Sequence, residues 1–105
     1  MTRGYNEHPE ATDELLGAIR HYHGERLGLG DDLADKARAA VQDILDSPDA
    51  WPRIPDWEEE PLLRVGKVGV YPYRIVYYVR RGDVVVIAYA HEKRRPGYWQ
   101  HRVTG

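Results

Sequence analysis

A segment with four prolines, residues 47–61, divides this chain into a first half patterned for helices and a second half patterned for strands. Before it, apolar residues recur at intervals of three and four, which predicts one helix over about Pro9–Leu27 and another that ends at Ser47-Pro48. After it, β-branched and aromatic residues dominate, which predicts three strands. These strands are expected over Leu62–Val68, Tyr73–Arg80 and Asp83–His91.

The connections between these elements indicate how they pack. Gly28-Leu29-Gly30 is so short that it favours an antiparallel helical hairpin. Arg81-Gly82-Asp83 predicts a tight turn between the last two strands, and Met1–Glu7 is a candidate edge strand. The predicted order is β-α-α-β-β-β, an α+β fold in which the helical hairpin packs on one face of a small, mainly antiparallel sheet. We expect a single domain over residues 1–105, with the other sheet face partly open as a binding surface.

Residue types within these elements predict a helix cap and a core. Asp31 or Asp32 is expected to cap the second helix, because a carboxylate can accept from the free N–H groups of the first turn. Apolar stripes on the two helices contain Leu15 and Ile44, which should face the sheet. Ile75 and Ile87 have the β-branched character expected of buried strand residues.

Several classes of protein are disfavoured by composition and motif. The chain has no cysteine, which excludes disulfide scaffolds, thiolate nucleophiles and cysteine-ligated zinc. Its longest apolar run, Val84–Ala90, has seven residues, and a membrane-spanning helix needs about twenty. Because His21 and His23 are two apart on a helix, they point in different directions and do not form a zinc pair. We expect a cytoplasmic protein with no cofactor, no metal and no membrane partner.

Charge is distributed unevenly along the chain. Residues 1–61 contain 6 Lys and Arg against 15 Asp and Glu, a balance of −9, whereas residues 62–105 contain 9 against 2, a balance of +7. Such a split gives the C-terminal half a surface suited to phosphates or to an acidic partner.

Five motifs in a fixed order resemble one known family. His8-Pro9-Glu10-Ala11 opens the first helix, Gly28-Leu29-Gly30 joins the helices and Ser47-Pro48 ends the second. The others are Val70–Tyr78, with its Tyr71-Pro72-Tyr73 core, and Ala90–Trp99, followed by Arg102. This order resembles the RelE/ParE superfamily of toxins from type II toxin–antitoxin systems, also called plasmid-stabilisation proteins. Relatives often have Phe-Pro-Tyr where this chain has Tyr71-Pro72-Tyr73.

The resemblance implies two possible mechanisms. RelE-like members cleave mRNA on the ribosome, and ParE-like members poison DNA gyrase without acting as nucleases. RNA cleavage without a metal needs a base for the 2′-hydroxyl, positive charge around the phosphate and an acid for the leaving oxygen. By similarity to RelE-like enzymes, the catalytic candidates are Lys67, Arg74, Arg94 and Tyr98, with His91 as an additional acid or base. Candidates for RNA or partner binding are Arg64, Lys93, Arg95, Trp99 and Arg102.

Alternatives for these residues remain open. Arg74 and His91 also occur in ParE-like members and are equally consistent with structural roles, and Tyr98 with Trp99 is consistent with a packing lid over the sheet. The resemblance implies a cognate antitoxin, whose binding segment should be acidic or amphipathic. The further partners are the ribosome and mRNA for a RelE-like toxin, or DNA gyrase for a ParE-like one. An inactive family member that binds RNA or a partner is the third hypothesis.

Overall fold

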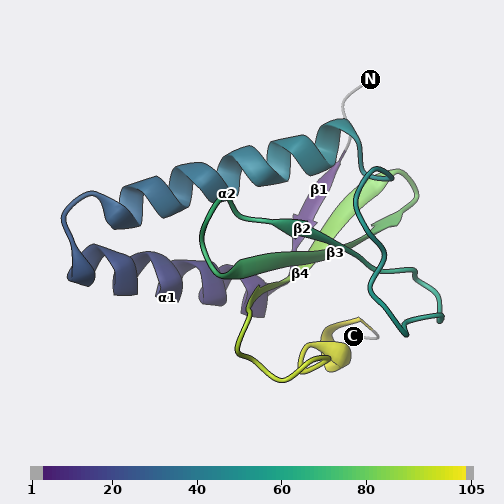
Figure 1. The fold of residues 1–105 in the computed structure, drawn as a ribbon. Helices are drawn as coiled ribbons and strands as arrows, with labels where there is room; N and C mark the ends of the chain where they lie inside the picture. The colour runs from purple at the N-terminus through teal and green to yellow at the C-terminus, as the bar shows by residue number, and fades with distance from the viewer. Residues whose placement is uncertain (1–3, 104–105) are drawn as a thin grey trace.

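The computed structural model describes residues 4–103 and has the predicted order of elements (Figure 1). The elements are β1 (Tyr5–Glu7), α1 (Pro9–Glu25), α2 (Leu29–Asp46), β2 (Arg64–Lys67), β3 (Tyr73–Arg80), β4 (Asp83–His91) and the short 3₁₀ helix η1 (Gln100–Arg102). The strands form one sheet in the order β1-β4-β3-β2. β1 is parallel to β4 and the other pairs are antiparallel, so the predicted α+β class with a mainly antiparallel sheet is confirmed. Met1–Arg3 of the predicted edge strand lie outside the described residues.

The two helices begin by different means. α1 starts at Pro9, and the His8 side chain caps it by accepting a hydrogen bond from the Glu10 N–H at 3.1 Å. α2 starts two residues before the predicted cap, because Gly28 adopts the left-handed conformation (φ 88°) and turns the chain directly into the helix. The prediction of an Asp31 or Asp32 cap is therefore wrong.

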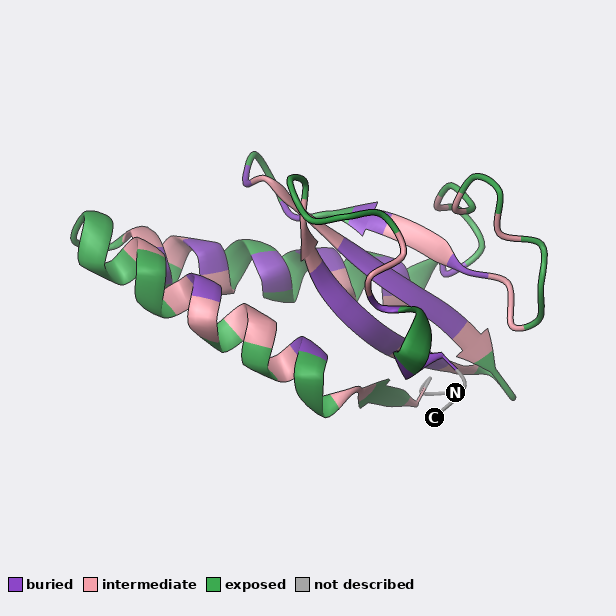
Figure 2. Ribbon diagram, turned by 90° about the horizontal axis from the view of Figure 1, so that it is seen from below, coloured by how far each residue is buried: buried purple, intermediate pink, exposed green. Residues whose placement is uncertain are grey.

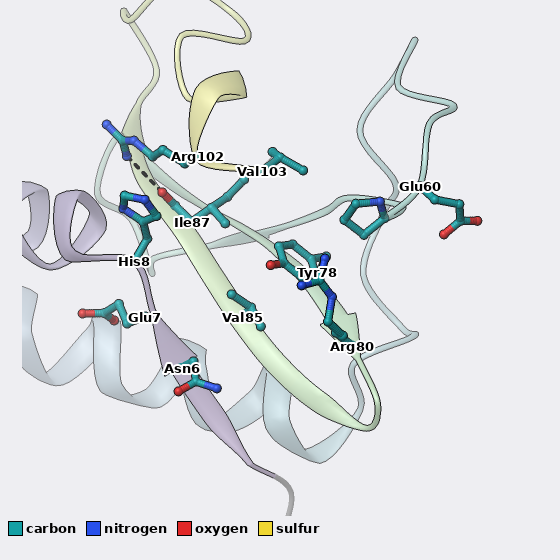
Figure 3. A pocket seen from close by; sticks show the side chains of 11 residues that line it. Asn6, Glu7, His8, Glu60, Tyr78, Arg80, Val85, Ile87, Arg102 and Val103 are labelled. Atoms are coloured by element: carbon teal, nitrogen blue, oxygen red, sulfur yellow. Dashed lines mark hydrogen bonds between the residues drawn. The ribbon is translucent and has the colours of Figure 1, made fainter. Parts of the chain in front are cut away.

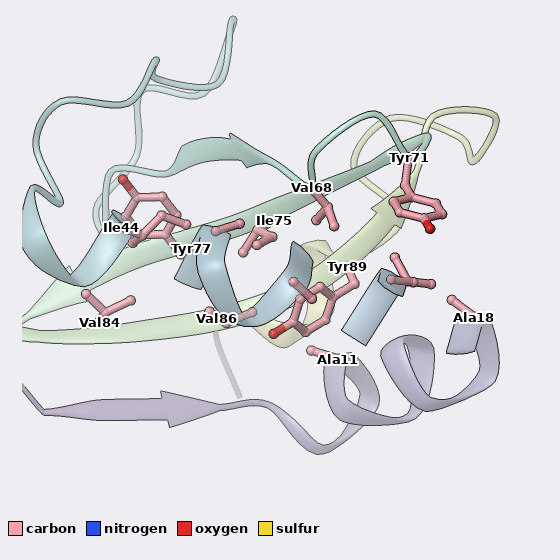
Figure 4. Packing of buried hydrophobic residues seen from close by; sticks show 13 residues of the cluster. Ala11, Ala18, Ile44, Val68, Tyr71, Ile75, Tyr77, Val84, Val86 and Tyr89 are labelled. Atoms are coloured by element: carbon pink, nitrogen blue, oxygen red, sulfur yellow. The ribbon is translucent and has the colours of Figure 1, made fainter. Parts of the chain in front are cut away.

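The main core lies between the helical hairpin and the sheet (Figure 4). Figure 2 shows the buried residues along the strands and on the inner side of each helix. Ile44 from α2 and Ile75 from β3 are fully buried there, and Leu15 packs against this core while partly exposed. The helices approach closely at Gly30, where an added Cβ would lie 2.8 Å from the Ile19 carbonyl oxygen.

The opposite sheet face is more covered than the sequence suggests. A second apolar cluster forms there from β3, β4, the 47–61 loop and the C-terminal segment: Leu63, Val76, Tyr78, Ile87, Ala88, Trp99 and Val103. Ile87 is buried as predicted, but in this second cluster. Trp99 packs on Trp57 with ring centroids 5.7 Å apart. A hollow of about 530 Å³ stays open on this face between Arg80 and the C-terminal segment (Figure 3).

None of the helices within residues 4–103 is long and apolar enough to cross a lipid bilayer.

Candidate functional site

Lys67 and Arg74 are direct neighbours on β2 and β3. The antiparallel register places them opposite each other, two positions from the Val65–Val76 pair. Because side chains alternate across a sheet, both share the face to which Val76 contributes, away from the helices. Lys67 is exposed, and the Arg74 Nη1 atom lies 3.3 Å from the Glu92 carboxylate.

His91 lies on the other face of the sheet from this pair. His91 pairs with Tyr73, the neighbour of Arg74 on β3, and neighbouring residues of a strand point to opposite faces. The His91 ring packs edge-on against the Tyr73 ring, with 5.1 Å between the ring centroids. The His91 Nδ1 atom accepts the Lys93 backbone N–H at 3.0 Å, so in the neutral ring the proton is on Nε2. The imidazole is therefore held by local contacts.

Arg94 and Tyr98 form a stacked pair beside His91. The Arg94 guanidinium lies 3.9 Å from the centre of the Tyr98 ring, within the range of a cation–π contact. The Tyr98 hydroxyl donates a hydrogen bond to Glu14, and burial together with this bond raises the pKa of Tyr98 above its usual value. Arg94, Tyr98, Glu14 and His91 line a cavity of about 220 Å³ whose other walls are Tyr73 and Tyr89.

Glu14 and Arg102 close the edge of β4 where β1 ends. β1 pairs with β4 only as far as Val86. Beyond that point, the Ile87 carbonyl accepts from Arg102 Nη1 at 2.9 Å (Figure 3). The Tyr89 N–H donates to Glu14 at 3.1 Å. The same Arg102 Nη1 lies 2.8 Å from Glu14, and the arginine side chain is only 6% exposed.

Three of the expected binding residues have partners within the fold. Trp99 and Arg102 are buried, so their side chains present little surface to RNA or to a partner protein. Arg64 Nη1 donates to the Trp51 carbonyl at 2.6 Å and so anchors the 47–61 loop to β2. Lys93 and Arg95 are exposed in the loop that follows β4, as expected of binding residues.

Glu14 was not a sequence candidate, although a signal for it exists. It lies three residues after Ala11 and four before Ala18, on the stripe of α1 that both alanines bury. A carboxylate on a buried helical stripe requires hydrogen-bond donors from elsewhere in the fold. Here Tyr98 and Arg102, from the far end of the chain, supply them.

The structure does not bring the five catalytic candidates together at one point. Lys67 and Arg74 point away from the helices, whereas His91 and Tyr98 border a cavity with Tyr73 and Tyr89, whose side chains pack toward the helices. Phosphoryl transfer needs its base, acid and cations within reach of a single phosphate. What the arrangement provides is a positively charged end of the sheet. Among residues 4–103, no three His, Asp or Glu side chains form a metal-binding group.

A family model described as the ParE toxin of the type II toxin–antitoxin system, parDE, matches residues 6–96. The match begins in β1 and ends in the loop after β4, so it includes both helices and nearly the whole sheet. It agrees with the superfamily resemblance drawn from the sequence motifs. No curated protein matches this chain.

Proposed function

Because this chain belongs to the ParE toxin family of type II toxin–antitoxin systems, we propose that it arrests growth by poisoning DNA gyrase and that it does not cleave mRNA. Membership of this family implies a cognate antitoxin that holds the toxin inactive. Gyrase as the target places the free toxin in the cytoplasm. The single observation that carries the choice of mechanism is the separation of the catalytic candidates over two faces of the sheet.

The state of the individual candidates supports the same choice. The Arg74 charge is partly neutralised by Glu92 at 3.3 Å. Tyr98, a catalytic candidate, has its hydroxyl bonded to Glu14 and its pKa raised, so it is poorly suited to deliver a proton to a leaving oxygen. The ion pairs of residues 4–103 include none that joins Lys67 to a carboxylate or a histidine.

Two features of the surface fit an acidic or amphipathic antitoxin segment. The exposed cations Lys93 and Arg95 suit its acidic residues. A groove of about 290 Å³ between the helices and β1 suits its apolar side chains, since Leu15, Ile19 and Val41 line it.

Lys67→Ala separates the two mechanisms, because Lys67 is exposed and its replacement should not disturb folding. In a ribonuclease, removal of a cation that faces the developing phosphate charge should lower the cleavage rate by about 10²–10³. For a gyrase poison, we expect the variant to stay toxic, with cleaved gyrase–DNA complexes reduced by less than about tenfold. Ribosome-dependent mRNA cuts that appear with the parent and vanish with Lys67→Ala would contradict the proposal.

A further inference from the structure

One end of the sheet carries five cations, with Glu92 beside Arg74 and the hydrogen-bonded carboxylate of Glu14 in the cavity that Arg94 borders. Lys67 and Arg74 face each other across β2 and β3 at this end, and the chain leaves β4 there into Lys93, Arg94 and Arg95. Glu92 is held next to the same strands by a hydrogen bond from its N–H to the Pro72 carbonyl at 2.9 Å. We call these five cations the cationic end, and its net formal charge with Glu92 is +4.

The fold itself does not account for this concentration of charge. Like charges directly opposite each other on an antiparallel pair are destabilising, and Lys67 and Arg74 are such a pair. Glu92 compensates only Arg74. Within residues 4–103, the ion pairs include none for Lys67, Lys93, Arg94 or Arg95. An anionic partner would offset a repulsion that the isolated toxin leaves in place.

Arg94 is also held in place before any partner arrives. Its guanidinium lies on the Tyr98 ring at 3.9 Å, and that ring is fixed in turn by the hydroxyl bond to Glu14. A stacked guanidinium keeps its N–H edge available, and this edge matches two oxygens of a phosphate. Less side-chain freedom is then lost when a phosphate binds.

We propose that the cationic end binds the phosphate backbone of DNA directly, so that the toxin contacts the DNA held by gyrase as well as the enzyme. This inference rests on the proposed function for its biological setting. The positions of the cations favour a polyanion over a single phosphate, because Lys67 and Arg74 lie on one sheet face and Arg94 borders the other side. Duplex DNA presents about one negative charge per 1.7 Å of its length, which a spread surface of this kind can follow.

The test is fluorescence anisotropy of a short labelled DNA duplex titrated with the full chain, without gyrase. Contacts from three or four of these cations predict a fall in affinity of about 40- to 150-fold between about 50 and 200 mM salt. Lys93→Glu combined with Arg95→Glu should weaken binding about tenfold or more and flatten this salt dependence. These two positions leave the Arg94–Tyr98 stack and the core intact.

The matched control is Arg20→Glu combined with Arg38→Glu, at two exposed arginines of the helices. Both double variants change the net charge from −2 to −6, so a difference between them reports the position of the charge. Equal loss of binding in both variants, or no binding by the parent at about 50 mM salt, would overturn the inference. Poly-L-glutamate that displaces the labelled DNA better than unlabelled duplex does at equal charge concentration would also overturn it, because the surface would then favour acidic peptides over DNA.

The inference and the proposed function fail separately. Accumulation of cleaved gyrase–DNA complexes by a toxin that does not bind DNA would refute the DNA contact and leave gyrase as the target. DNA binding by a toxin that has no effect on gyrase would support DNA binding at the cationic end and refute the proposed function.

Discussion

Replacement of Arg102 by methionine should destabilise the protein strongly, because Arg102 links the C-terminal segment to α1 and to the edge of β4. The parent arginine makes hydrogen bonds to Glu14 at 2.8 and 3.2 Å and to the Ile87 carbonyl at 2.9 Å. Loss of the charged pair removes about 1.5–3 kcal/mol, and the carbonyl left without its donor adds about 1 kcal/mol. We therefore expect the free energy of unfolding to fall by about 2.5–4 kcal/mol, a large part of what a domain of this size has.

Chemical denaturation of a double-mutant cycle measures this contribution. Arg102→Met, Glu14→Gln and the double variant should be non-additive by about 1 kcal/mol or more, because each single change removes the same charged hydrogen-bonded pair. Arg102 Nε keeps its contact with the Glu10 carboxylate at 3.2 Å in the Glu14→Gln variant. Arg38→Met is the control, since Arg38 forms an exposed ion pair with Asp35 at 3.0 Å, and it should change stability by less than about 0.5 kcal/mol. An Arg102→Met variant within about 1 kcal/mol of the parent, or single changes that add, would refute the reasoning.

Three further outcomes are expected. The Tyr71 hydroxyl donates a hydrogen bond to the Asp32 carboxylate at 2.7 Å and lowers the pKa of that carboxyl. The bond therefore stabilises the fold above the ordinary pKa of an aspartate, and this stabilisation is lost as the pH falls and the carboxylate is protonated. Tyr71→Phe should unfold with a weaker pH dependence between about pH 5 and 3, and an unchanged dependence would exclude this bond as the cause. Ile44→Ala should cost about 2–5 kcal/mol in denaturant unfolding, and an unchanged midpoint would place the core elsewhere. Charge reversal at Arg94 and Arg95 should weaken antitoxin binding in calorimetry at low salt more than at high salt, and equal loss at both would remove the electrostatic explanation.

Elements defined by neighbouring residues could be predicted from the sequence. The helical periodicity that predicts a helix over about Pro9–Leu27 is a local signal, and the structure has this helix over Pro9–Glu25. The turn at Arg81-Gly82-Asp83 is another local signal that appears in the structure. α2 starts earlier than the sequence predicts because Gly28, in the left-handed conformation, makes a side-chain cap unnecessary. Residue type alone favours Asp31 or Asp32 as the cap of α2, whereas the Asp32 carboxylate accepts a hydrogen bond from the Tyr71 hydroxyl in the structure.

Contacts between the two ends of the chain were not predictable in the same way. Glu14 and Arg102 are 88 positions apart, and no local sequence pattern indicates that they are in contact. The covering of the second sheet face likewise depends on Trp57 and Trp99, which come from an irregular loop and from the C-terminal segment. The candidate cations were found by resemblance, but only the register of β2 and β3 shows that Lys67 and Arg74 share a face that His91 does not.

The most direct test of gyrase as the target is to express this toxin without its antitoxin and examine DNA and mRNA in the same cells. We predict growth arrest with cleaved DNA covalently trapped on gyrase and with no new ribosome-dependent cuts in mRNA. Purified toxin should also trap cleaved plasmid DNA when gyrase is supplied. Growth arrest accompanied by ribosome-dependent mRNA cuts, with gyrase unaffected, would contradict this prediction.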